Sequence, residues 1–326
     1  MALRSSASSS SNRCSPALAA LLCAGLLAVG CKSAPQVFPD KGGGPIAPEA
    51  TRVTFQPPAG ERIVEKSVTQ RTERQGQTRN EEVVRATLES RFDRAERGWT
   101  LTQGMQAVEY RHNGTVVENP LVQFMTRLPI RARLAEDGTF VRLDNADEIQ
   151  AAIGAAFSDP NEVAVMREYF APEAVEAQVR REWEGKYGGL LGREVAAGHA
   201  LYQVESLATE SAELFYVTER KVQGTRTAAD GTRELVLSVS CPTSVDAAAN
   251  AEELRRKLDE AGAPALHPGV RCEGEQIIGL QPFVPRSLAQ QIMVKVEGKG
   301  GPLELVLVKE TRTESVGTQG AAQEVR

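Results

Sequence analysis

The strongest constraint on the fold is an alternation of apolar and polar residues with a period of two. In residues 81–92, EEVVRATLESRF, one face is formed by alternate residues that begin at Val84 and end at Phe92. The other face begins at Glu81 and is mostly charged. Because successive side chains of a strand point to opposite faces of a sheet, this segment is predicted to be an antiparallel strand with one wet face.

Turn signals of one form join such segments. They are Asn113-Gly114-Thr115, Asp137-Gly138-Thr139 and Asp230-Gly231-Thr232. Asn-Gly and Asp-Gly tolerate the positive φ that tight hairpins require, and strand-like sequence flanks each of the three. The Asn113 triplet also matches a glycosylation sequon, but we interpret it as a turn. Three such hairpins predict a mainly antiparallel β-sheet.

Helical patterns are concentrated in the middle of the chain, over about residues 145–185. Asn145 and Glu148 have the spacing of an N-cap and its N3 partner before ADEIQAAIGAAF, and NEVAVMREYF and PEAVEAQVRREW follow. A later amphipathic helix within residues 247–261 ends at Gly262.

The order of strands, helices, strands, helix and strands is an α+β pattern. We expect a mainly antiparallel sheet, for which a half-barrel is one candidate form, with a helical middle segment and one later helix. Residues 303–308, LELVLV, are apolar on both faces and are predicted to form a central strand. Aromatic residues make up 5% of the chain, so a core of mainly Val, Leu, Ile and Ala is expected.

The first thirty residues have the pattern of an export signal. Arg4 and Arg13 are accompanied by no acidic residue, and residues 17–29 are all Ala, Leu, Cys, Gly or Val. Thirteen helical residues span roughly 20 Å, which is short of a ~30 Å hydrocarbon core. A stable transmembrane helix is therefore disfavoured.

Residues 27–31, LAVGC, resemble the lipobox of bacterial lipoprotein precursors. The resemblance implies cleavage between Gly30 and Cys31 and covalent lipid on Cys31, which would anchor the protein in a membrane of the bacterial cell envelope. Lys32 follows where the family's inner-membrane retention signal is Asp, which favours the outer membrane. The motif departs from its best form at Ala28, where Leu is usual. The alternative is a secreted protein that is cleaved elsewhere.

The remaining cysteines then form a pair. If Cys31 carries lipid, Cys241 and Cys272 are left in the processed chain. A lone pair in an exported protein most simply forms a disulfide, which would stabilise the fold by roughly 3–4 kcal/mol. Two free buried thiols are the alternative.

These features divide the chain into four parts. Residues 1–30 are predicted to be a signal peptide, and residues 31–50, with their prolines and Gly triplet, a lipidated cysteine and flexible tether. Residues 51–315 form the α+β body, as one large domain or two β-rich halves around the helices. Residues 316–326 are predicted to be a frayed tail.

Charge and motifs argue against several functions. The net charge of −5 and the lack of a dense Lys/Arg cluster disfavour nucleic acid as a partner. The chain has no HExxH, CxxC or GxSxG motif and no phosphate-binding glycine loop. The acidic run Asp144–Glu148 lacks the glycine and distal glutamate of an EF-hand, so we interpret it as helix capping. We expect no catalytic residue, no metal and no cofactor besides the lipid.

A glycine-rich loop is the most unusual feature of the body. It comprises Tyr187, Gly188, Gly189, Leu190 and Leu191. One interpretation is a flexible rim over an apolar ligand cavity. The other is the end of a helix and a connection whose leucines fill the core.

The pattern of the body is similar to half-barrel lipoprotein and lipid carriers and to β-rich envelope lipoproteins. We expect a non-enzymatic envelope lipoprotein that binds an envelope protein or a hydrophobic ligand. One alternative is a lipid or lipoprotein carrier, which requires an apolar cavity between sheet and helices. Another is a hydrolase with two carboxylates in a cleft.

Overall fold

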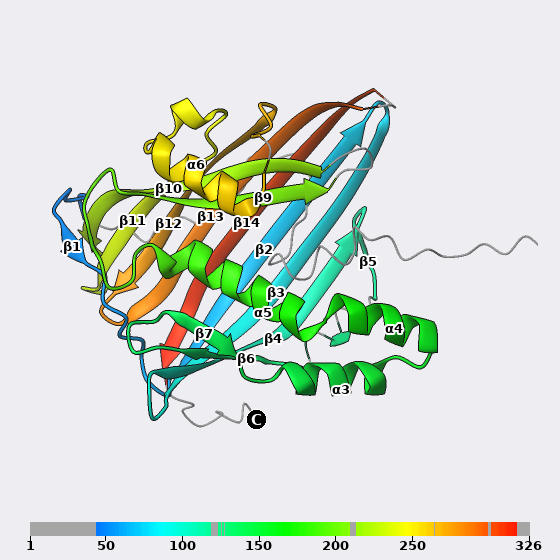
Figure 1. Cartoon of the computed structure of the whole chain (residues 1–326), viewed down its shortest axis with the longest axis horizontal. Coiled ribbons are helices and arrows are strands. Elements are labelled where there is room, and N and C mark those ends of the chain that lie inside the picture. The colour runs from blue at the N-terminus through cyan, green and yellow to red at the C-terminus, as the bar shows by residue number, and fades with distance from the viewer. Residues whose placement is uncertain are drawn as a thin grey trace, which may run out of the picture.

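The computed structural model describes residues 44–118, 123–124, 126, 128–208, 213–263, 265–298 and 301–317 (Figure 1). The predicted signal peptide, the lipidation site at Cys31, most of the tether and the end of the tail lie outside these residues.

One large antiparallel sheet forms most of the described chain and confirms the predicted fold class. Along the sheet the strands follow the order β7-β6-β4-β3-β2-β14-β13-β12-β11-β10-β9, with β5 paired to β4. The sheet is not closed into a barrel. Its strands are β2 (Arg62–Gln75), β3 (Thr78–Arg94), β4 (Trp99–His112), β5 (Thr115–Val116), β6 (Ile130–Leu134), β7 (Phe140–Leu143), β9 (Ala200–Ala208), β10 (Glu213–Thr227), β11 (Arg233–Ser240), β12 (Val270–Leu280), β13 (Phe283–Gly298) and β14 (Gly301–Gly317). A separate short pair joins β1 (Thr51–Arg52) to β8 (Glu194–Val195).

The C-terminal strand β14 lies in the middle of the sheet, between β2 and β13, as the sequence predicted. Leu303, Leu305 and Leu307 are buried, whereas the alternate residues are half-buried. The strand continues to Gly317, so Val316 belongs to the sheet and packs against the main core instead of lying in a tail.

The predicted helices are present. They are α3 (Ala146–Ala156), α4 (Pro160–Tyr169), α5 (Pro172–Trp183) and α6 (Ala251–Ala261). A π-helical turn η1 (Glu184–Gly188) and a 3-10 turn η2 (Val245–Ala247) are present in addition. Figure 1 shows α5 lying across one face of the sheet. No helix in the described part of the chain is long and apolar enough to cross a membrane.

Two helix ends show how local chemistry sets these boundaries. Gly262 ends α6 with a φ of 63°, a left-handed conformation that favours glycine. Asn145 stands at the start of α3, but its side chain makes no capping bond. Its Oδ1 instead accepts from the backbone N–H of Arg131, and its Nδ2 donates to the carbonyl of Pro129, so it fixes the helix to β6.

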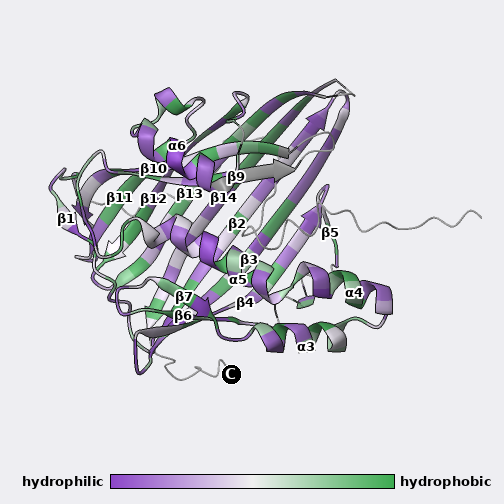
Figure 2. Cartoon of the chain, viewed as in Figure 1, coloured by the Kyte–Doolittle hydropathy of each residue, from purple (hydrophilic) through white to green (hydrophobic). Residues whose placement is uncertain are grey.

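The alternation in β3 follows the sequence prediction. Val84, Ala86, Ser90 and Phe92 are buried, whereas Arg85 is exposed. Figure 2 shows the same alternation as bands of opposite hydropathy along the strands. The three predicted turns join β4 to β5, β6 to β7 and β10 to β11.

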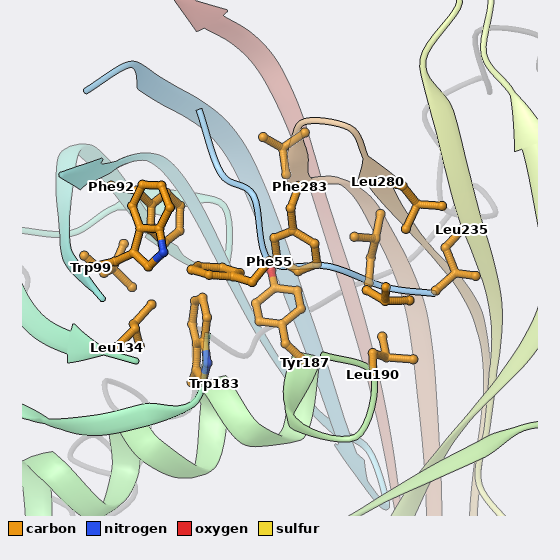
Figure 3. Close-up of a cluster of buried hydrophobic side chains, with 14 of the residues drawn as sticks. Phe55, Phe92, Trp99, Leu134, Trp183, Tyr187, Leu190, Leu235, Leu280 and Phe283 are labelled. Atoms are coloured by element: carbon orange, nitrogen blue, oxygen red, sulfur yellow. The ribbon is translucent and has the colours of Figure 1, made fainter. Parts of the chain in front are cut away.

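The main core is richer in aromatic residues than the composition suggested. Phe55, in the segment before β2, makes edge-to-face contacts with four rings (Figure 3). They belong to Phe92, Trp99, Trp183 and Phe283, at centroid distances of 5.6, 5.9, 5.9 and 5.3 Å. This cluster fixes the end of α5 against the sheet.

Candidate functional site

A cavity of about 210 Å³ lies between the sheet and the helices α3 and α5. Strands β2, β3, β4, β6 and β14 supply residues to one side, and the helices supply the other. Aligned strands place residues of one face side by side, so the inward alternation of these strands sets the chemistry of the lining.

The part of the cavity formed by β3, β4, β6 and the helices is mainly apolar, and we call it the apolar wall. Its members come from five elements and the segment before β6. They are Leu88, Phe92, Leu101, Met105, Phe124, Leu128, Ile130, Ala132, Ile149, Val175 and Val179.

The part formed by β2 and β14, together with η1, is polar, and we call it the polar wall. It contains Glu65, Ser67, Lys186, Tyr187, Lys309 and Thr311. Thr311 donates a hydrogen bond from its hydroxyl to the Ser67 hydroxyl across the two strands, at 3.2 Å. The cavity therefore has two chemically distinct sides, which is the arrangement that an amphipathic ligand requires.

Burial shifts the pKa of the two strand residues in this wall. Burial raises the pKa of Glu65, and the nearby positive charges of Lys186 and Lys309 oppose the rise. The pKa of Lys309 is lowered to about 8, first by burial and then by the positive charge of Lys186. Glu182 and Glu205 oppose that fall, whereas Arg220 adds to it.

Tyr187 is the one residue of the predicted rim loop that lines the cavity. Its ring packs edge-to-face on Trp183 at 4.8 Å, and burial raises its pKa. Leu190 is fully buried in the main core, and Leu191 packs against it. The leucines thus occupy the core, as the second interpretation of this loop described.

The two glycines of the loop play a different part. Gly188 ends the π-helical turn, and Gly189 follows it. A Cβ on Gly189 would lie 2.3 Å from Cδ2 of Leu201 on β9, so a larger residue there would require that side chain to shift.

The predicted disulfide between Cys241 and Cys272 is present, with its Cα atoms 4.9 Å apart. It joins the end of β11 to β12 and closes the excursion that contains η2 and α6. Both cysteines pack against a cluster that includes Leu214, Ile292 and Leu305. No residue of that cluster lines the cavity, so the disulfide supports the fold at a distance from the site.

Gly30 and Cys31, the predicted cleavage and lipidation residues, lie outside the described residues. Within the described chain, no group of three or more His, Cys, Asp or Glu residues is placed to hold a metal ion.

The charged residues of the polar wall were not predicted, although the sequence contains a signal for Lys309. This residue continues the spacing of Leu303, Leu305 and Leu307, which places it on their buried face. A lysine at the inward position of a central strand is unusual enough to mark a site.

No protein-family model matches the chain, and no curated protein matches it. A chain of lipovitellin, solved in a study of lipid–protein interactions, is similar over 83% of this chain, with 12% identity and a TM-score of 0.41. The match spans 26% of the lipovitellin chain. A likeness of this degree does not establish a shared fold or ligand.

Proposed function

We propose that this protein is a non-enzymatic binding protein that takes a hydrophobic ligand into the cavity between α5 and the sheet. The apolar wall is the observation that carries this proposal. A cavity of about 210 Å³ with a mainly apolar lining gives a hydrophobic ligand room between the helices and the sheet. Ligand sites are typically apolar cavities with a small number of placed polar groups.

The predicted lipid anchor fits this role. With lipid on Cys31 and a tether before the body, the cavity would lie close to a membrane that contains hydrophobic ligands. We propose that the protein is located in the cell envelope, anchored in the outer membrane in preference to the inner membrane. If the protein is a lipid carrier, it would also transfer the ligand to another carrier or membrane.

The test uses residues 32–326, which retain every described residue and lack the lipid-bearing cysteine. Lipids that co-purify are extracted and identified by mass spectrometry, and affinity is measured by titration with the neutral fluorescent probe N-phenyl-1-naphthylamine. We expect ligand or probe at about one equivalent. Absence of both co-purified lipid and saturable probe binding would refute the proposal.

A matched pair of variants locates the binding. Leu88 lines the cavity on β3, so Leu88→Trp should place the larger ring in it and weaken probe binding at least tenfold. Thr87 is the preceding residue on the opposite face of the strand, so Thr87→Trp should bind like the parent. Equal binding by both variants would place the ligand elsewhere.

A carboxylate-dependent hydrolase is the second candidate, because Glu65 and Glu182 both line the cavity. Turnover of p-nitrophenyl acyl esters or glycosides that is abolished in Glu65→Gln would favour this activity over binding alone.

A further inference from the structure

We propose that the ligand of this cavity is a single-chain amphiphile whose anionic head group, a carboxylate or a phosphate, pairs with Lys309 and Lys186 while its chain lies against the apolar wall. This inference rests on the proposed binding function and specifies its ligand class. Four observations carry it: unpaired ammonium groups, unpartnered polar atoms beside them, carboxylates that are already committed, and the size of the cavity.

The two lysines of the polar wall lack the carboxylate partners that Lys66 and Lys295 have on the outer surface. Lys66 pairs with Glu314 at 2.6 Å, and Lys295 pairs with Glu304 at 2.6 Å. Among the described residues, no carboxylate oxygen lies within 4.0 Å of the ammonium of Lys309 or Lys186. A half-buried ammonium without a close counter-charge favours binding of an anion, because Coulomb attraction is stronger away from bulk water.

Polar atoms without partners lie beside Lys309 on the same face of the sheet. Thr69 and Gln290 are its cross-strand neighbours on β2 and β13, and both are buried. Thr69 Oγ1 and Gln290 Nε2 have no hydrogen-bond partner among the described residues. The same holds for Nε of Arg220, whose charge acts on Lys309. None of these three residues lines the cavity itself, but buried donors are nearly always paired, so donors without partners beside Lys309 favour an acceptor next to its ammonium.

The carboxylates near these donors do not act as the missing acceptor. Glu205 accepts hydrogen bonds from Tyr216 at 2.9 Å and Thr218 at 2.8 Å. Glu182 accepts a hydrogen bond from Nε2 of Gln178 at 3.0 Å. Burial raises the pKa of Glu65, the positive charges of Lys186 and Lys309 oppose that rise, and its carboxyl makes no ion pair within 4.0 Å with either lysine. An oxygen-rich anion therefore complements the polar wall better than a cation or a neutral head group does.

The size of the cavity admits an alkyl chain. A cavity of about 210 Å³ is many times the roughly 10–15 Å³ that one water molecule needs, so it has room for more than isolated waters. A molecule with one chain is the smallest amphiphile that can reach both walls, so the proposed ligand class is a fatty acid or a single-chain lipid phosphate.

The experiment compares four twelve-carbon ligands that differ in the head group: dodecanoate, dodecyl phosphate, dodecanol and dodecylamine. Each competes with N-phenyl-1-naphthylamine for residues 32–326 at pH 7, below its micelle concentration. We expect at least one of the two anions to bind at least tenfold more tightly than dodecanol, and dodecylamine to bind most weakly. A preference for dodecanoate over dodecyl phosphate indicates a fatty acid, and the reverse preference indicates a lipid phosphate.

Variants test the assigned residues. In the double variant Lys186→Met and Lys309→Met, the anion preference should disappear while the affinity for dodecanol stays within about twofold. Lys66→Met, on the opposite face of β2, should keep the preference. Retained dodecanol binding shows that the double variant is folded, and if it fails to fold, the ranking of ligands by the parent protein still decides.

The outcomes separate this inference from the proposed function. Equal binding of dodecanol and both anions, or an anion preference that survives in the double variant, would overturn the inference and leave hydrophobic binding intact. Failure of all four ligands and of the probe to bind would instead refute the proposed function itself.

Discussion

Removal of the Cys241–Cys272 disulfide should lower the stability of the body by an amount that the loop length sets. The two cysteines are 31 residues apart in sequence. In the chain-entropy model a cross-link over a loop of that length stabilises the fold by about 3.7 kcal/mol, because it restricts the unfolded chain. The loop contains η2 and α6, whose packing on β9 and β10 does not depend on the sulfur atoms.

Urea unfolding of residues 32–326, followed by circular dichroism, measures this loss. With an m-value of about 3 kcal/mol/M, a loss of about 3.7 kcal/mol lowers the midpoint by roughly 1.2 M. The double variant Cys241→Ala and Cys272→Ala should lose slightly more, because the half-buried sulfurs also pack against the cluster around Leu214.

Treatment with a reductant distinguishes the stability that comes from the cross-link from the stability that comes from packing of the sulfur atoms. A reductant should lower the midpoint of the parent protein and leave that of the double variant unchanged. Probe binding in the absence of urea should be the same for both proteins, since the disulfide cluster does not line the cavity. A midpoint that moves by less than about 0.3 M on reduction would show that the cross-link contributes much less than loop closure predicts.

Three further predictions concern the core, the polar wall and the anchor. Phe55→Ala removes a ring that contacts four others and should lower the free energy of unfolding by about 3–5 kcal/mol in the same urea assay; a loss below about 2 kcal/mol would contradict its central role. Because the pKa of Lys309 is lowered to about 8, its ammonium loses its proton as the pH rises through that value, so dodecanoate affinity should fall between pH 7 and 9 while dodecanol affinity stays constant. In the full chain expressed with its own signal, Cys31→Ser should move the protein from the detergent phase to the aqueous phase in a partitioning assay, and an unchanged distribution would argue against lipidation.

The features predicted from sequence are those that neighbouring residues determine. The alternation in residues 81–92 sets which side chains of β3 are buried, whatever the rest of the chain does. Asn113 and Gly114 adopt φ values of 48° and 81°, so that turn follows from the conformational freedom of two residues. The end of α6 at Gly262 has the same local origin.

The features missed from sequence depend on contacts between distant segments. Phe55 lies in an irregular segment, and only the meeting of β3, β4, β13 and α5 gives its ring four aromatic neighbours. The cavity has the same origin, because its volume depends on the separation between α5 and the sheet. Periodicity reports which face of an element is apolar, but it does not report whether the opposing face fills the space.

The protein can keep the polar wall because other contacts stabilise the fold. An unpaired buried charge such as that of Lys309 opposes folding, since it is removed from water without a close partner. The aromatic cluster around Phe55 and the disulfide stabilise the sheet through contacts that do not involve Lys309. The fold therefore does not depend on an apolar residue at that position. Replacement of the lysines by apolar residues would favour folding and remove the means of holding an anion. On the proposed function, the position of Lys309 on a central strand serves a ligand and not stability.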